Sequence, residues 1–295
     1  MNPSRIILSF VLLLGFYSTS FRAQEYEPKG SVIQTLTPSK LMAKGQYDFK
    51  WFNNLYTEDQ ATFEGETNDI ARQTFFTSTL EAYVGVTDNK RINLGLIVEA
   101  RSNVVAGRDA LEVFQFDGEA GTARSGVTSI APSIKFVPFK NVGNFSVQSS
   151  FFFPLVDNES EQGVFLDQNG YTFQNRFFYD YTFTGGTWQL FSELNTELNF
   201  GDEPSFANNS LRLTPGVFLS YFPSSKFTVL ALTQHSQLVD VGGDSEFSQD
   251  FTAVGGGAKY QLTNALNIEV LYTNFVRGND TGLGETFNLG LRAVF

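Results

Sequence analysis

The sequence contains no cysteine, a single histidine and only two methionines among its 295 residues. The lack of cysteine excludes disulfides and metal-thiolate sites. The single histidine, His235, leaves one imidazole that could activate a nucleophile. Beyond the N-terminal region no stretch approaches twenty apolar residues, which excludes a membrane protein built from helices.

The N-terminal region carries the pattern of an export signal. Arg5 precedes the apolar run 6–16 (IILSFVLLLGF), and a polar stretch opens at Gln24. A basic start followed by a short apolar run is typical of a secretory signal peptide. We therefore expect a signal peptide at residues 1–23, a periplasmic segment at 24–42 and the folded domain at 43–295. The segment 24–42 is too short to form a globular plug domain.

The remaining chain is rich in strand-forming residues, with 32 Phe and 11 Tyr, and shows no helical period. Twelve runs of alternating polar and apolar residues are separated by connections of two lengths. Short connections fall at 88–90, 140–144, 184–187, 223–226 and 263–265. Long connections fall at 58–70, 103–125, 157–171, 201–209, 240–249 and 278–283. Such regular alternation is typical of an outer-membrane barrel.

A soluble β-sandwich is the main alternative for regularly spaced strands, and the outward face distinguishes the two. In the run 92–102, Ile92, Leu94, Leu96 and Val98 share one face, and Glu99 lies on the other. A sandwich exposes polar side chains to water, whereas a membrane barrel is apolar on its outer face. We therefore predict an all-β fold, a closed antiparallel up-and-down transmembrane barrel of about twelve strands, with short periplasmic turns and longer acidic extracellular loops.

The charged residues at inward strand positions are nearly balanced in sign. The predicted lumen-lining residues are Asp48, Lys50, Glu81, Glu99, Arg101, Lys135, Arg176, Asp180, Glu193, Glu197, Arg212, Lys259, Glu269, Arg277 and Arg292. These charges either pair across the lumen and close it or line a wet channel. A barrel of this size is wider than the eight-stranded type that side chains fill, which favours a narrow water-filled path. The inward aromatics expected to constrict it are Phe152, Phe178, Phe191, Phe218 and Phe275.

The net charge of -11 comes mainly from the long connections, so one rim of the barrel is acidic. The acidic rim either keeps the surface soluble, or it binds divalent cations at the lipopolysaccharide surface and concentrates cationic solutes. The densest group is Asp157, Glu159, Glu161 and Asp167, whose spacing does not fit an EF-hand loop. We predict no metal site and no cofactor. The acidic balance also disfavours nucleic-acid binding.

The sequence offers little support for catalysis, and we predict no catalytic residues. Ser236 follows His235 directly, and neighbours in a strand point to opposite faces. Glu193 and Glu197 would lie about 13 Å apart along one strand face, too far for a carboxylate pair. The glycine-rich stretch 253–260 (AVGGGAKY) lacks the phosphate-loop pattern and favours a curved strand.

The segment 284–295 (GETFNLGLRAVF) alternates to its last residue. Phe287, Leu289, Leu291 and Phe295 share its apolar face, which we interpret as the signal read by the barrel-assembly machinery. In FTVLALTQHSQL (227–238) both faces are largely apolar, so periodicity does not fix which face is inward.

Three segments carry a resemblance to known proteins: 36–57 (LTPSKLMAKGQYDFKWFNNLYT), 85–96 (GVTDNKRINLGL) and the C-terminal Phe295. They resemble those of Bacteroidota outer-membrane β-barrel proteins of largely unassigned role. The segment 85–96 is also similar to barrels grouped with the MetA-pathway phenol-degradation proteins, which implies a transporter-like function and supplies no site residues.

These observations lead to one functional hypothesis and two alternatives. The leading hypothesis is a passive or gated pore for small solutes in the outer membrane of a Gram-negative bacterium. The first alternative is a closed structural or accessory barrel that presents its loops to a partner protein. The second is a surface enzyme that hydrolyses lipid. Expected partners are outer-membrane lipid, lipopolysaccharide and, during biogenesis, the barrel-assembly machinery.

Overall fold

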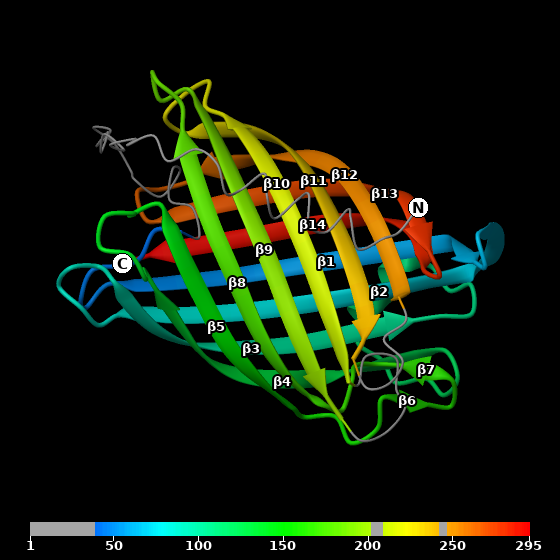
Figure 1. Cartoon of the computed structure of the whole chain (residues 1–295). Helices are drawn as coiled ribbons and strands as arrows, with labels where there is room; N and C mark the ends of the chain where they lie inside the picture. Colours follow the sequence, from blue (N-terminus) through cyan, green and yellow to red (C-terminus); the bar gives the residue numbers. More distant parts are fainter. Residues whose placement is uncertain (1–38, 202–208, 242–246) are drawn as a thin grey trace.

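The computed structural model describes residues 39–201, 209–241 and 247–295, and these form a closed barrel of twelve antiparallel strands (Figure 1). The predicted all-β barrel is confirmed. The expected signal peptide at 1–23 and most of the expected segment 24–42 lie outside the described residues. The first strand begins at Tyr47, a few residues after the expected start of the barrel.

The barrel runs in chain order, interrupted only by the small hairpin β6 (Ser160–Glu161) and β7 (Val164–Phe165), which lies between β5 and β8. The twelve barrel strands are β1 (Tyr47–Phe63), β2 (Glu66–Gly85), β3 (Ile92–Val104), β4 (Ala123–Phe136), β5 (Phe145–Pro154), β8 (Tyr171–Thr182), β9 (Trp188–Phe200), β10 (Ser210–Tyr221), β11 (Phe227–Asp240), β12 (Phe247–Gln261), β13 (Leu266–Asn279) and β14 (Gly282–Val294).

All five short connections fall where the sequence predicts them, at one end of the barrel, which we call the short-turn end. Two predicted long connections, 58–70 and 278–283, are instead tight turns. Strands β1 and β2 continue past the expected loop to a turn at Glu64 and Gly65, both with positive φ. Strands β13 and β14 meet at a turn that contains Asp280, also with positive φ. These strand extensions contain many polar residues, so they do not show the apolar alternation by which the other strands are predicted.

The barrel closes between β1 and β14, the first and last strands. Their ladder runs from Asp48 opposite Val294 to Ala61 opposite Gly282. Tyr47 and Phe295 exchange both backbone hydrogen bonds, at 2.9 and 3.0 Å. Because every barrel strand has two neighbours, the backbone donors and acceptors of the wall find partners within the sheet.

Apolar side chains cover the outer wall. The exposed ones include Leu80, Leu94, Leu96, Phe173, Leu194, Val217, Val229, Val254, Val270, Phe287 and Leu289. Aromatic side chains gather at the short-turn end of this belt, among them Tyr47, Trp188, Tyr221, Phe227 and Tyr260. An apolar band edged by aromatic residues is the surface that a lipid bilayer requires of a barrel. In the described part of the chain, no helix has the length and apolarity to cross a membrane.

Candidate functional site

The barrel interior is the candidate site because it collects charged side chains from many strands. Strand pairing places fourteen of the fifteen predicted lumen-lining residues on the inner face of the wall. They are Asp48, Lys50, Glu81, Glu99, Arg101, Lys135, Arg176, Asp180, Glu193, Glu197, Arg212, Lys259, Glu269 and Arg292. The inward aromatics Phe152, Phe191, Phe218 and Phe275 line the same interior.

Arg277 differs from the prediction and lies on the outer face. The ladder between β12 and β13 shifts between Thr252 and Ala253, so that Val276 is an extra residue on β13. Such a bulge reverses which residues beyond it face inward. Arg277 therefore shares the outer face with Asp250, and their side chains form an ion pair with N–O distances of 2.5 and 3.1 Å. Simple alternation misplaces Arg277 because the sequence does not mark the bulge.

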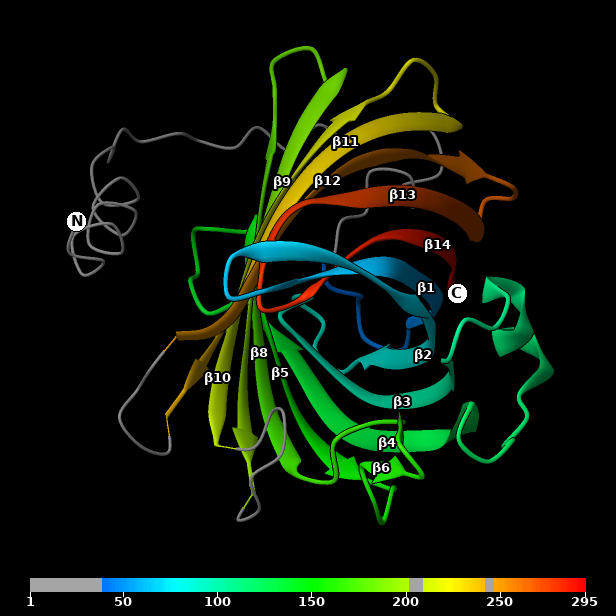
Figure 2. The ribbon, with the colours of Figure 1, turned by 90° about the vertical axis from the view of Figure 1, so that its right-hand side faces the viewer.

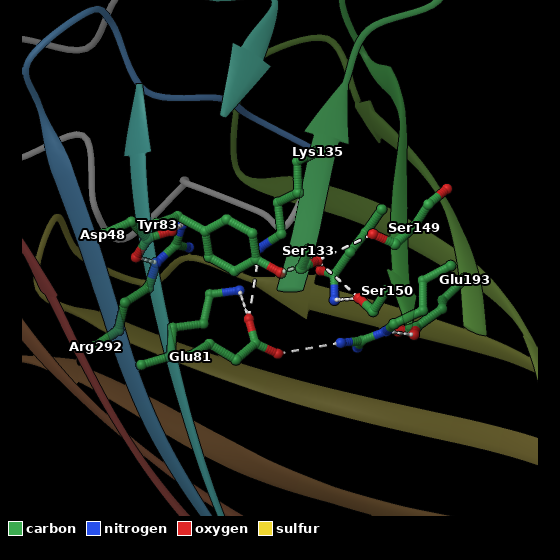
Figure 3. Close-up of polar contacts among 12 residues, drawn as sticks. Asp48, Glu81, Tyr83, Ser133, Lys135, Ser149, Ser150, Glu193 and Arg292 are labelled. Atoms are coloured by element: carbon green, nitrogen blue, oxygen red, sulfur yellow. Dashed lines mark hydrogen bonds and ion pairs between the residues drawn. The ribbon is translucent and has the colours of Figure 1, made fainter. Parts of the chain in front are cut away.

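Glu81 on β2 is the centre of the largest charge cluster. Its carboxylate lies 3.3 Å from Lys50 Nζ, 3.5 Å from Lys135 Nζ and 3.4 Å from an Arg176 guanidinium nitrogen (Figure 3). Three strands (β3, β4 and β5) separate β2 from β8, which carries Arg176. The contact between Glu81 and Arg176 therefore crosses the lumen. Arg176 Nε also lies 2.6 Å from Glu193 on β9.

Polar and aromatic contacts extend this cluster on both sides. Lys135 Nζ lies 3.8 Å from the centre of the Tyr83 ring, in cation–π geometry. The Tyr83 hydroxyl is 2.8 Å from Ser133 Oγ. On the other side Arg292 donates two hydrogen bonds to the Asp48 carboxylate, at 2.9 and 2.8 Å (Figure 3). The cluster therefore fixes long side chains in the lumen towards the short-turn end.

Further ion pairs line the interior. Arg101 lies 3.2 Å from Asp167 and 3.8 Å from Glu99. Other pairs join neighbouring strands, with Arg212 at 3.4 Å from Glu197 and Lys259 at 2.5 Å from Glu269. The lumen carries similar numbers of acidic and basic residues, and many of them form ion pairs with each other. Alternation predicts the face of each residue, but it does not predict its partner.

Residues 39–44 cross the mouth of the barrel at the short-turn end. Ser39 donates a hydrogen bond to the Asp180 carboxylate on β8. Lys44 forms a bridge with Gly85 at the end of β2, on the other side of the mouth. Leu41 and Met42 are buried, with 7% and 4% of their surface exposed. A segment held at two separated strands and buried between them narrows this end of the lumen.

The connection 155–170 narrows the opposite end. It contains the β6–β7 hairpin and packs against the inner face of β3 and β4. Asn103 donates hydrogen bonds to the carbonyls of Phe165 and Leu166, at 2.9 and 3.1 Å. Arg124 donates to the carbonyls of Glu159 and Val164, at 2.9 and 3.3 Å. Asp167 from the acidic loop is thereby drawn inside, where it meets Arg101.

Between the two constrictions lies a chamber of about 630 Å³. One part of its wall is charged and carries Lys50, Glu81, Arg176, Glu193 and Glu269. The other part is apolar and comes mainly from β9 to β13, with Phe191, Phe218, Leu230, Leu232, Phe251, Leu271 and Phe275. A smaller cavity of about 120 Å³ shares Glu99, Phe152 and Gln174 with it and reaches Asp167 under the connection 155–170.

The structure resolves the orientation of β11, which periodicity leaves open. Leu230 and Leu232 point inward opposite Gly257 and Gly255 of β12. A Cβ at Gly257 would lie 2.1 Å from the Val270 carbonyl oxygen, so this part of the wall requires a residue without a side chain. The glycine-rich stretch thus leaves space in the chamber beside two leucines. Leucines that lie opposite glycines on the next strand indicate the inward face of β11, and the periodicity of β11 alone does not reveal this.

His235 and Ser236 lie on opposite faces of the wall. His235 faces outward, and its Nδ1 is 3.0 Å from Thr252 Oγ1. Ser236 faces the interior and accepts a hydrogen bond from Thr214 Oγ1 at 3.2 Å. Within the ranges that the structure describes, no group of three or more His, Asp and Glu side chains has an arrangement that could hold a metal ion.

The residues proposed as an assembly signal lie on the outer face of β14 and just beyond its end. Phe287, Leu289 and Phe295 are exposed by 49%, 42% and 68%, and Leu291 is half-buried. The Phe295 ring lies 6.4 Å from that of Phe49 across the closing ladder. These side chains contribute to the apolar outer belt.

No protein-family model matches the sequence, and no curated protein matches it either. The barrel resembles a number of solved structures, including the following two. An outer membrane channel from Pseudomonas putida F1 has a TM-score of 0.66 and 12% identity, with 92% of this chain and 100% of that chain covered. The β domain of the Bordetella autotransporter Brka has a TM-score of 0.55 and 11% identity, with 84% and 99% covered. At such identities the likeness concerns the fold, which is that of an outer-membrane β-barrel.

Proposed function

We propose that the protein is a narrow, gated pore in the outer membrane that passes small solutes. The observation that supports this proposal is the chamber of about 630 Å³ inside the barrel. Residues 39–44 cross one mouth of the barrel, and the connection 155–170 packs inside the wall at the other end. A cavity of this volume falls in the range of roughly 300–1,000 Å³ that holds small organic ligands. Movement of either segment would widen the path between the chamber and water on that side.

The lining favours solutes with both a polar and an apolar part. Ionic groups on one side of the chamber can exchange hydrogen bonds with a charged or hydroxyl group of the solute. The opposite side offers aromatic rings, with Phe191 and Phe218 centred 5.4 Å apart and Phe251 and Phe275 4.2 Å apart. Aromatic and leucine side chains take up an apolar body that a purely polar pore would exclude. We propose no enzymatic reaction in this interior.

A liposome-swelling assay tests the proposal. Proteoliposomes are diluted into isosmotic solutions of small solutes that carry an aromatic or alkyl group, and into matched sugars too large for the chamber. We expect swelling with the small solutes and none with the large sugars. Equal impermeability to both sets would favour the second candidate, a closed barrel that presents loops to a partner. The observation that favours this candidate is the Glu81 cluster that bridges the lumen.

A further inference from the structure

The connection 105–122 lies outside the barrel. It contains the short 3-10 helix η1 (Ala110–Gln115), which packs on the outer face of the wall beside β2 and β3. In Figure 2, which looks at the long-loop end, the short teal-green helix stands beside the ring of strands. Val113 is fully buried against the outward side chains of Leu55, Phe76 and Val104. This connection therefore covers a patch of the surface that elsewhere carries the apolar belt.

Beside these apolar residues, the covered wall carries two hydroxyl side chains. Thr74 and Ser102 point outward here, yet only 0% and 1% of their surface is exposed. The Ser102 hydroxyl donates to the Val113 carbonyl at 2.6 Å, and Thr74 lies 3.0 Å from the hydroxyl of Thr57. Hydroxyl groups gain no hydrogen bonds from acyl chains, so uncovered they would be unfavourable in a bilayer.

The connection covers the two hydroxyl groups and presents an apolar surface of its own. Leu111, Phe114 and Phe116 are exposed by 66%, 50% and 52%. The Phe114 and Phe116 rings contact Phe76 edge-on, at 5.1 and 6.0 Å, and so continue the outer belt. Membrane barrels carry aromatic residues at the level of the lipid headgroups, at the edge of the apolar belt. Leu111, Phe114 and Phe116 lie at a corresponding edge.

The charged residues of the connection hold its shape. Arg108 contacts Glu112 at 2.5 Å, Asp117 at 2.9 Å and Glu119 at 3.2 Å, which ties the two ends of the connection together. The hydrogen bonds from Arg108 keep the pKa of Asp117 below its usual value. With one guanidinium among three carboxylates the cluster stays net negative, and it holds the connection in the shape that presents the apolar side chains.

We propose that Leu111, Phe114 and Phe116 dock the connection 105–122 into the lipid acyl chains at the headgroup boundary. The connection is thereby a lipid-facing cover for the section of the barrel wall that carries Thr74 and Ser102. The proposal rests on the barrel spanning a membrane, as the proposed function requires. It names a membrane contact and is independent of which solute the pore passes.

Single-cysteine labelling tests this proposal, because the chain has no cysteine of its own. Phe114→Cys carries a fluorophore in phosphatidylcholine liposomes that contain lipids with a nitroxide near the top of the acyl chain. Leu96→Cys on the exposed belt is the membrane control. Gly118→Cys, on the same connection with open space around its Cα, is the water control. Leu111→Cys repeats the test at a side chain with greater exposure.

We expect the labels at 114 and 111 to be quenched by the nitroxide lipid as strongly as the label at 96, and the label at 118 to be quenched by aqueous iodide. Iodide quenching at 114 and 111 with normal lipid quenching at 96 would overturn the proposal. Protection from both quenchers would also overturn it, and would indicate a second copy on this surface. Absence of lipid quenching at 96 would instead contradict the membrane barrel itself.

Discussion

Replacing Gly85 by valine is expected to raise the single-channel conductance several-fold. Gly85 ends β2 on the inner face, and a Cβ at this position would lie 2.0 Å from the Ala43 carbonyl oxygen and 2.6 Å from that of Met42. Backbone atoms cannot yield to such a contact without moving the segment. The valine side chain should therefore displace residues 41–44 from the mouth and widen the short-turn end.

Two further variants separate this effect from a general loss of structure. Gly143→Val adds the same side chain in a short turn where a Cβ meets no atom within 4 Å, and we expect unchanged conductance. Deleting residues 39–43 should raise conductance without introducing a clash. Heat-modifiable migration on a gel verifies that each variant is folded. Wild-type conductance in both folded Gly85→Val and the deletion variant would show that the segment does not limit the pore.

Replacing Glu81 by glutamine is expected to destabilise the barrel and to shift its ion selectivity towards anions. The carboxylate contacts Lys50, Lys135 and Arg176, and the side chain of Lys135 is only 3% exposed. Removing one partner of a buried ion pair leaves an uncompensated charge, which typically costs about 3 kcal/mol or more of unfolding free energy. The same substitution makes the lumen one charge more positive, so anions should be favoured in the pore.

Glu269→Gln is the matched control for this prediction. Glu269 pairs with a single cation, Lys259, whose side chain is 33% exposed, and a pair in contact with water contributes less than about 1 kcal/mol. Urea titration of the protein in detergent micelles measures the loss of stability, and reversal potentials in a salt gradient measure selectivity. Equal stability losses in the two variants would argue against Glu81 as the centre of the interior network.

The sequence predicts the barrel well because a two-residue period is a direct consequence of strand geometry. It places Glu81 and Arg176 on the inner face, and it separates His235 from Ser236. It does not predict that Glu81 reaches Arg176, since the contact joins strands that are not neighbours. Arg277 is misplaced because a bulge adds one residue to β13.

The two constrictions and the outer cover are features of tertiary packing. Residues 39–44 are held in the mouth by the hydrogen bond from Ser39 to Asp180 and by the bridge between Lys44 and Gly85, and such isolated contacts leave no periodic pattern. The apolar side chains in the connection 105–122 indicate that part of it packs against an apolar surface, but they do not identify that surface. Whether such a connection turns into the lumen or onto the outer wall depends on partners far away in the sequence, such as Phe76.

In our proposal a narrow path for solutes runs through the chamber of a membrane-spanning barrel. Planar-bilayer recording of the refolded mature protein tests for this path. We predict discrete, small conductance steps, because the lumen is constricted at both ends and paired charges line the path between them. A complete lack of conductance over a wide range of voltages, from protein shown to be inserted and heat-modifiable, would contradict the pore.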